Sequence, residues 1–356
     1  MTKSNLSPIK EIISDAKKGK MFILVDDKDR ENEGDLVIPA SKCNSKKINF
    51  MATHGKGLVC LALTKNQVEQ LGLPLMSSLN KARMQTAFTV SIEAKKGITT
   101  GISAFDRAKT IKVAIKKKSK NKDIVSPGHV FPLVARSGGV LERAGHTEAS
   151  VDISKLANLN PSAVICEIMN QDGRMARMND LIGFSKKHKL KIASIEDLIS
   201  FRLKNEKLIK LVETKVIKVF GKRYFFLKYK NNIDNTFNYV IKNGLFRKNK
   251  PIKVRVISKE FNNTLKKIND AKIKKTLNFL SKYNSFALII IKDQKSKQQK
   301  ISEEFSNKNI LRYYGIGAQI IKDLGIKKMI LVSRSKKKVI GLDGYGIKII
   351  KQEIIK

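Results

Sequence analysis

The chain has 356 residues and a hydrophobic fraction of 42%, which is enough for two packed domains and excludes wholesale disorder. No apolar run is long enough to cross a bilayer, and the polar, lysine-rich N-terminus lacks the apolar core of a signal peptide, so we predict a cytoplasmic protein with no membrane partner. The formal net charge of +41 is typical either of a nucleic-acid or anionic-membrane partner or of a general compositional bias. The lysines are spread along the chain, with no zinc finger, aromatic RNA-binding motif or dense basic tail, so we favour bias.

Cysteines and histidines are scarce, which limits the candidates for metal and proton chemistry. The cysteines have neither metal-ligand spacing nor the even number of a disulfide framework: Cys43, Cys60 and Cys166. Any site that needs an imidazole must draw on four residues: His54, His129, His146 and His188.

The first predicted elements surround an acidic segment. Apolar residues at helical spacing predict a helix over 7–18, and short apolar runs predict strands at 21–25 and 36–39. Between them, residues 26–35 carry six carboxylates within ten positions. A hard divalent cation would relieve their repulsion, whereas a solvated surface turn is the simpler alternative.

The next elements alternate in type. We expect helices over 45–53 and 64–71, and strands over 58–63 and 88–92. The small-residue segment 99–103 offers hydroxyls to a phosphate, or Ser103 simply caps the following helix. His129 follows Pro-Gly at a turn that leads into a strand within 126–133, and a lone histidine there is more often structural than catalytic.

A second polar segment, 143–149, is predicted to be a glycine-punctuated loop before a helix at 152–156. Arg143, Gly145 and Thr147 suit a phosphate, and His146 suits a metal or proton transfer. Glu167 lies in the apolar strand 163–169, where it is either a general acid or base or a strand-end residue facing solvent. Helices over 180–188 and 195–205 then close the first domain.

These motifs, in order, resemble 3,4-dihydroxy-2-butanone 4-phosphate synthase over roughly residues 6–204. The resemblance rests on Asp26-Asp27, residues 30–36, residues 99–104 with Asp106-Arg107, residues 126–133, residues 143–149 and residues 165–169. It implies conversion of D-ribulose 5-phosphate to 3,4-dihydroxy-2-butanone 4-phosphate and formate, through enolisation, dehydration and rearrangement with Mg²⁺ or Mn²⁺. It implies that Glu31 and His146 bind the metal, that His129 and Glu167 are catalytic, and that the protein is a homodimer. The substrate contacts implied by the resemblance are Arg30, Glu31, Asp35, Arg143, Ala144, Gly145, His146, Thr147 and Glu167.

The second half is predicted to be another layered α/β domain, with strands in 212–229, 238–256 and 286–291 and helices in 262–283. It resembles GTP cyclohydrolase II, clearly only over 311–350. That family binds catalytic zinc through three cysteines after a Val-Arg-Val-His-Ser stretch, whereas here residues 254–260 read Val-Arg-Val-Ile-Ser-Lys-Glu. No cysteine follows Cys166 and no histidine follows His188, so we expect no zinc and no cyclohydrolase activity.

We therefore expect a synthase domain at 1–205 and a degenerate cyclohydrolase-like domain at 206–356. The second domain has several open roles: packing or assembly, binding of a nucleotide, or binding of RNA. A working bifunctional enzyme that also opens GTP is the remaining alternative, and the missing cysteines disfavour it.

Overall fold

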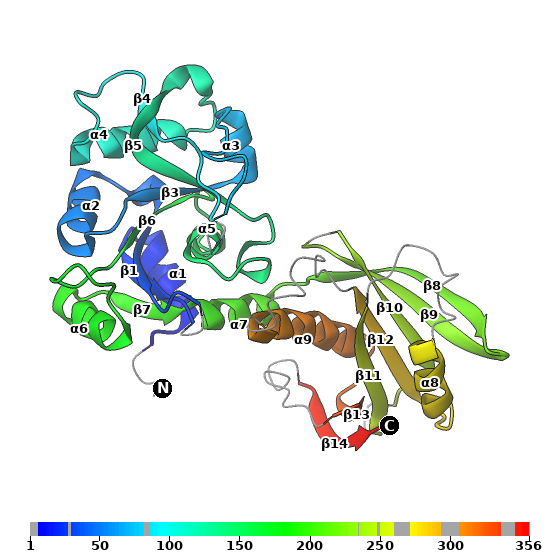
Figure 1. The fold of residues 1–356 in the computed structure, drawn as a ribbon. Helices are drawn as coiled ribbons and strands as arrows, with labels where there is room; N and C mark the ends of the chain where they lie inside the picture. Colours follow the sequence, from blue (N-terminus) through cyan, green and yellow to red (C-terminus); the bar gives the residue numbers. More distant parts are fainter. Residues whose placement is uncertain are drawn as a thin grey trace. The chain divides into compact units, whose positions relative to one another are not determined.

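The computed structural model describes residues 6–27, 30–81, 84, 86–233, 235–247, 250–259, 271–292, 306–335 and 346–355. The chain divides into two compact units, Met1–Phe201 and Arg202–Lys356 (Figure 1). Each unit contains one seven-stranded sheet with helices packed on it, which confirms the predicted layered α/β class. Among the described residues, no helix has both the length and the apolar character needed to span a membrane.

The sheet of unit 1 has the strand order β4-β5-β3-β6-β2-β1-β7. Its strands are β1 (Phe22–Val25), β2 (Gly34–Pro39), β3 (Cys60–Thr64), β4 (Ile92–Ala94), β5 (Ile124–Ala135), β6 (Ala163–Glu167) and β7 (Lys191–Ser194). The helices of this unit are α1 (Ile9–Lys17), α2 (Ser45–Phe50), α3 (Lys65–Gln70), α4 (Ala104–Ala114), α5 (His146–Leu156), α6 (Met178–His188) and α7 (Ile195–Asn205), which crosses the division between the units.

Alternation of side chains along the strands produces two buried faces, as expected for a sheet covered on both sides. Ile23, Leu36 and Leu61 belong to a core that also contains Ile48 of α2 and Ile111 of α4. The opposite face packs against α5, which contacts β2, β3, β5 and β6. The first residue of α5 therefore lies over the interior of the sheet rather than at the periphery.

Two predictions about unit 1 were wrong in detail. Helix α5 begins at His146, six residues earlier than expected, because its first turn is built from buried polar residues that show no apolar period. Phe88 and Thr89 form only isolated bridges, and the regular strand of that region is Ile92–Ala94. The other predicted helices and strands of this unit are confirmed with small shifts of their ends.

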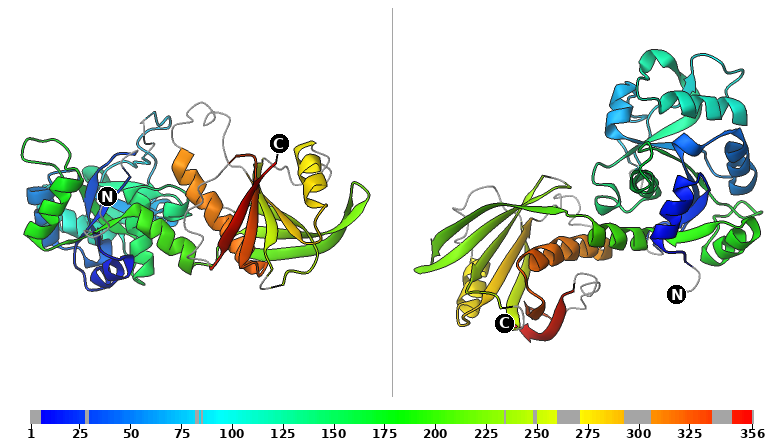
Figure 2. Two further views of the ribbon diagram at one scale, coloured as in Figure 1. Left: turned by 90° about the horizontal axis from the view of Figure 1, so that it is seen from below. Right: turned by 180° about the vertical axis from the view of Figure 1, so that it is seen from behind.

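Unit 2 has the strand order β14-β13-β11-β12-β10-β9-β8. Its strands are β8 (Ile209–Val219), β9 (Lys222–Asn231), β10 (Phe237–Asn243), β11 (Ile252–Lys259), β12 (Phe286–Lys292), β13 (Lys328–Ser333) and β14 (Lys348–Ile354). Helices α8 (Ala271–Leu280) and α9 (Ser306–Asp323) lie on opposite faces of this sheet (Figure 2). The predicted helical residues 262–270 and the glycine-rich residues 341–345 lie outside the described residues.

Strand β12 shows how unit 2 forms two cores. Its odd-numbered residues Ala287, Ile289 and Ile291 pack with residues of α9, and its even-numbered residues Phe286, Leu288 and Ile290 pack with residues of α8. A continuous apolar run is what a strand buried on both faces requires, so the prediction of a buried strand here is confirmed.

Candidate metal and substrate site

The acidic segment between β1 and β2 folds around the carboxylate of Asp26. Its Oδ1 accepts a hydrogen bond from the Glu33 backbone N–H at 2.9 Å, and its Oδ2 accepts from the Glu31 N–H at 3.2 Å and from Arg30 Nη1 at 2.8 Å. Asp26 and Asp35 are both buried. The alternative of a solvated surface turn is therefore wrong for these two carboxylates.

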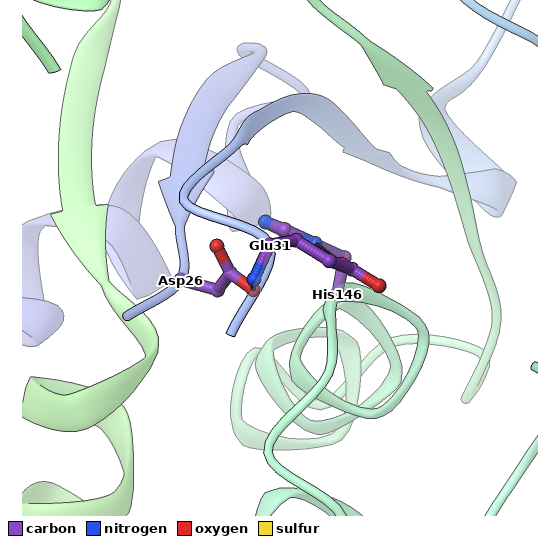
Figure 3. Close-up of side chains that lie close together, drawn as sticks. All are labelled: Asp26, Glu31 and His146. Atoms are coloured by element: carbon purple, nitrogen blue, oxygen red, sulfur yellow. Dashed lines mark hydrogen bonds and ion pairs between the residues drawn. The ribbon is translucent and has the colours of Figure 1, made fainter. Parts of the chain in front are cut away.

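Asp26 and Glu31 meet His146, the first residue of α5, in a compact cluster (Figure 3). One ligand-capable atom from each residue lies within 4.8 Å of the others. His146 Nδ1 is 3.7 Å from Glu31 Oε2, and His146 Nε2 is buried without a hydrogen-bond partner. Two carboxylates and an imidazole with a free nitrogen suit a divalent cation, because a bound ion would satisfy these buried atoms.

Asp35 and Glu167 are brought beside this cluster by strand pairing. They are direct partners in the antiparallel β2–β6 ladder, so their side chains project from the same face of the sheet. His146 Nδ1 lies 3.8 Å from Asp35 Oδ1, and that oxygen is buried with no hydrogen-bond partner. Residues from two distant sequence motifs therefore meet the acidic segment at one place.

Burial and charge together set unusual proton affinities here. Burial raises the pKa of Asp35 to about 7 despite the opposing effect of His146, and the charges of Glu167 and Glu31 act in the same direction as burial. Burial also opposes the charge of His146, but Asp35 and Glu31 outweigh it and raise the pKa of His146 to about 9. Burial would raise the pKa of Glu31, yet His146 and Arg30 lower it to about 2.

Glu167 is held by the turn before β3. Its Oε2 accepts a hydrogen bond from the Leu58 backbone N–H at 2.9 Å. A Cβ atom on Gly57 would lie 2.6 Å from both Oε2 and the main-chain oxygen of Glu167, so only glycine permits this close approach. Glu167 is half-buried and anchored, which excludes the alternative of a strand-end residue pointing freely into solvent.

Arg143 is ordered by Glu148 of its own segment and by two residues of the distant segment 84–86. Its Nη1 donates to Glu148 Oε2 at 2.7 Å, and its Nη2 donates to the Met84 carbonyl and to Thr86 Oγ1. Gly145 is tightly enclosed, because a Cβ atom there would lie 2.3 Å from Arg143 Nη1. Ala144 is half-buried between these two residues, and Thr147 is buried in the first turn of α5. Residues 143–145 are thus held in a fixed conformation just before His146, the candidate metal ligand at the start of α5.

His129 lies within strand β5 and contacts a residue that the sequence did not single out. Its Nδ1 is hydrogen-bonded to Glu93 of β4. Gly101 also lies against Glu93, so the 99–103 segment and His129 converge on this carboxylate. Among the described residues, no hydrogen bond or ion pair joins His129 to Glu31 or His146. Glu93 gave no sequence signal beyond one acid in a short alternating stretch.

The segment 99–103 is organised by Asp106. Thr99 donates from its hydroxyl and its backbone N–H to this carboxylate, which also accepts the Gly101 N–H. Ser103 Oγ accepts the Asp106 N–H and caps α4. Ser103 therefore caps α4, and contact of the 99–103 segment with a phosphate stays a prediction.

Comparison with known proteins agrees with this geometry. The family model for 3,4-dihydroxy-2-butanone 4-phosphate synthase matches residues 10–201. The chain belongs to the 3,4-dihydroxy-2-butanone 4-phosphate synthase family. As a member of the synthase family it is an enzyme, and unit 1 contains the matched domain. The model for GTP cyclohydrolase II matches residues 210–354, within unit 2.

Relatives of the synthase family match along both units. Riboflavin biosynthesis protein RibBA of Aquifex aeolicus is 42% identical, with 98% of this chain and 92% of the relative covered. A 3,4-dihydroxy-2-butanone 4-phosphate synthase of Photobacterium phosphoreum is also 42% identical, with 97% and 98% covered.

Solved structures of the synthase family show the same relationship. The crystal structure of RibBX, a two-domain synthase from A. baumannii, is 38% identical, with a TM-score of 0.82 and 98% and 99% of the two chains covered. A synthase solved in complex with two magnesium ions is 38% identical, with a TM-score of 0.54, and covers 56% of this chain and 98% of its own.

Proposed function

We propose that unit 1 converts D-ribulose 5-phosphate to 3,4-dihydroxy-2-butanone 4-phosphate and formate in riboflavin biosynthesis. The proposal depends above all on the cluster of Asp26, Glu31 and His146, whose ligand atoms lie within 4.8 Å of one another beside Asp35. The synthase relatives, one of them solved with magnesium ions, support the same reaction.

Glu31 and His146 would bind Mg²⁺ or Mn²⁺, with Asp26 as a third ligand that the sequence analysis did not single out within the acidic segment. A divalent cation bound there would supply Lewis-acid polarisation of the substrate ketone and its neighbouring hydroxyl. Arg30 pairs with both acidic members of the cluster, at 2.8 Å from Asp26 and 2.5 Å from Glu31. It would therefore orient these carboxylates and contact the sugar beside them.

Asp35 and Glu167 are the proposed proton carriers. A carboxylate whose pKa is about 7 accepts and returns protons near neutral pH, and Asp35 has this property because it is buried. Glu167 faces Asp35 across the β2–β6 ladder and would be the second group that moves protons to and from the substrate. Arg143, Ala144, Gly145 and Thr147 would hold the phosphate end, and the imidazole of His129, oriented by Glu93, would act in the same active site.

The direct test measures formate and the four-carbon ketone phosphate formed from ribulose 5-phosphate, with Mg²⁺ and with EDTA. Wild type should turn over only with metal, and Glu31→Gln or His146→Gln should lose at least about 100-fold in kcat/KM. Glu33→Gln is the matched control, because Glu33 is in the same segment but pairs loosely with Arg177 at 3.9 Å. A folded wild-type enzyme that releases no formate would refute the proposal.

We infer that unit 2 does not open GTP, that it needs no zinc, and that the enzyme is a homodimer. The chain has no cysteine after Cys166 and no histidine after His188, so soft and imidazole ligands for a tetrahedral zinc site are missing. The full chain incubated with GTP and zinc, without ribulose 5-phosphate, should release no formate. Zinc-dependent release of formate from GTP would show that the chain is bifunctional. A monomeric mass in analytical sedimentation would contradict the proposed homodimer.

A further inference from the structure

Unit 1 contains a cavity of about 600 Å³ whose lining includes none of the residues assigned to the synthase reaction. It is lined by Thr64 and α3, the end of α4 with the residues after it, the end of β5 with residues 136–137, Lys155 of α5, and residues 160–161. Its volume falls within the range of small-molecule sites.

The cavity lies at the opposite end of the sheet from Glu167. Strands β3 and β5 are parallel neighbours, and their last residues, Thr64 and Ala135, are paired in the ladder and both line the cavity. Strand β3 runs antiparallel to β6, so its end at Thr64 is remote from the end of β6 that carries Glu167. The carboxyl ends of adjacent parallel strands are a common location for ligands in α/β sheets.

The lining of the cavity is strongly cationic. It contains no aspartate or glutamate and five cationic residues: Lys65, Lys116, Lys117, Arg136 and Lys155. Lys65 has one exposed ion pair, with Glu69 at 3.6 Å. Within the described part of the chain, no ion pair engages the other four. Their charges therefore add in a concave surface, where they attract anions more strongly than isolated surface lysines do.

Side-chain amides hold the wall of this cavity in place. Gln67 donates to Asn160 Oδ1 at 2.9 Å, and Asn160 donates in turn to the carbonyl of Ile115 at 3.0 Å. Gln70 donates to the carbonyls of Lys117 and Ser119. The backbone that carries Lys116 and Lys117 is thus fixed from two sides before any ligand arrives, which lowers the entropic cost of binding.

We propose that this cavity binds a small anion that carries two or more phosphates. A planar guanidinium such as that of Arg136 suits two phosphate oxygens, and four ammonium groups match further negative charge. Compositional bias explains many lysines in this chain, but it does not explain an acid-free, braced cavity at the ends of two parallel strands.

The test is calorimetric titration of the full chain with inorganic pyrophosphate, in EDTA and about 0.15 M salt, so that metal chelation and weak surface binding are suppressed. Wild type should show one saturable site. The double variant Lys116→Gln with Lys155→Gln should bind at least about ten-fold more weakly. The control, Lys10→Gln with Lys46→Gln, removes the same charge from exposed positions outside the cavity and should stay within about two-fold of wild type.

Both double variants should keep wild-type synthase turnover, which reports that they are folded. Unchanged affinity in the cavity variant, equal weakening in both variants, or the lack of a saturable site would each overturn the proposal.

Discussion

Asp35 and Glu167 face each other across the β2–β6 ladder, and His146 Nδ1 lies 3.8 Å from the buried Oδ1 of Asp35. Because the negative charge of Asp35 helps to raise the pKa of His146 to about 9, Asp35→Asn should lower that pKa. NMR titration of histidine-labelled, metal-free protein would follow it, with His146→Gln to assign the signal. Glu69→Gln, at an exposed position paired with Lys65, should leave the titration unchanged, and an unaltered pKa in Asp35→Asn would contradict the described pairing.

Metal binding should depend on pH through His146. The imidazole must be neutral to bind a cation, so affinity for Mn²⁺ should rise by up to about ten-fold per pH unit until about pH 9, with release of a proton. The stability of the metal-free protein should change with pH in the opposite direction. The pKa of His146 in the folded state, about 9, exceeds its ordinary value of 6.5. The charged imidazole therefore contributes its whole stabilisation below pH 6.5, and this contribution is lost as pH rises through 9. Calorimetry in buffers of different ionisation enthalpy measures how many protons are released when Mn²⁺ binds. An affinity for Mn²⁺ that does not change between pH 6 and 9 would exclude His146 as a ligand.

Gly57 should be essential for activity because of what lies against it. In Gly57→Ala the added carbon would meet Glu167 at 2.6 Å, and displacing that carboxylate should lower kcat by about 10- to 100-fold. Gly183→Ala is the contrasting change, since nothing lies within 4 Å of its Cβ position in α6. It should keep full activity and raise stability by up to about 1 kcal/mol. Equal activity of the two variants would show that Glu167 tolerates the shift.

Gln319 of α9 should be important for the stability of unit 2. Its side chain accepts from the Leu208 N–H at 2.8 Å and donates to the carbonyls of Leu203, in the last turn of α7, and of Glu206, just after it. Gln319→Leu would remove these three hydrogen bonds and should cost about 2–4 kcal/mol. Chemical denaturation of the full chain would measure it. Synthase turnover should persist under native conditions. An unchanged free energy of unfolding in Gln319→Leu would mean that water takes over the hydrogen bonds of the lost amide.

Arg255 of β11 is buried, and its Nε and Nη1 have no hydrogen-bond partner among the described residues. Burial, followed by the charge of Arg334, lowers the pKa of its guanidinium. Arg255→Met should therefore raise the Tm of the ligand-free chain by about 2–8 °C. Arg247→Met, at an exposed position of the same unit, should change Tm little. A lower Tm for Arg255→Met would indicate that the guanidinium is already satisfied.

Much of the fold was predictable because the pattern of apolar residues reports which faces of an element are buried. The run from Phe286 to Ile291 is apolar at every position, and it forms a strand buried on both faces. The start of α5 was missed for a different reason, since Thr147 and Glu148 are buried polar residues that show no apolar period. Glu148 accepts hydrogen bonds from the Arg136 N–H and from Arg143, and these form only once the loop before α5 has folded against the helix.

The candidate site was predictable where a motif of the resembling family singles out its residues. Glu31 and His146 do meet, as the resemblance implied. Asp26 was not recognised as a third ligand-capable group, because its hydrogen bonds to the Glu31 and Glu33 backbone arise only once the segment has folded. Glu93 was missed because its contact with His129 depends on the pairing of β4 with β5.

Strand β12 separates two cores by the parity of its residues, with α9 on one face and α8 on the other. Insertion or deletion of one codon within this strand would exchange the two sets of side chains and misplace both at once. Length variation among homologous chains should therefore accumulate in the connections around β12, and the strand itself should change only by substitution.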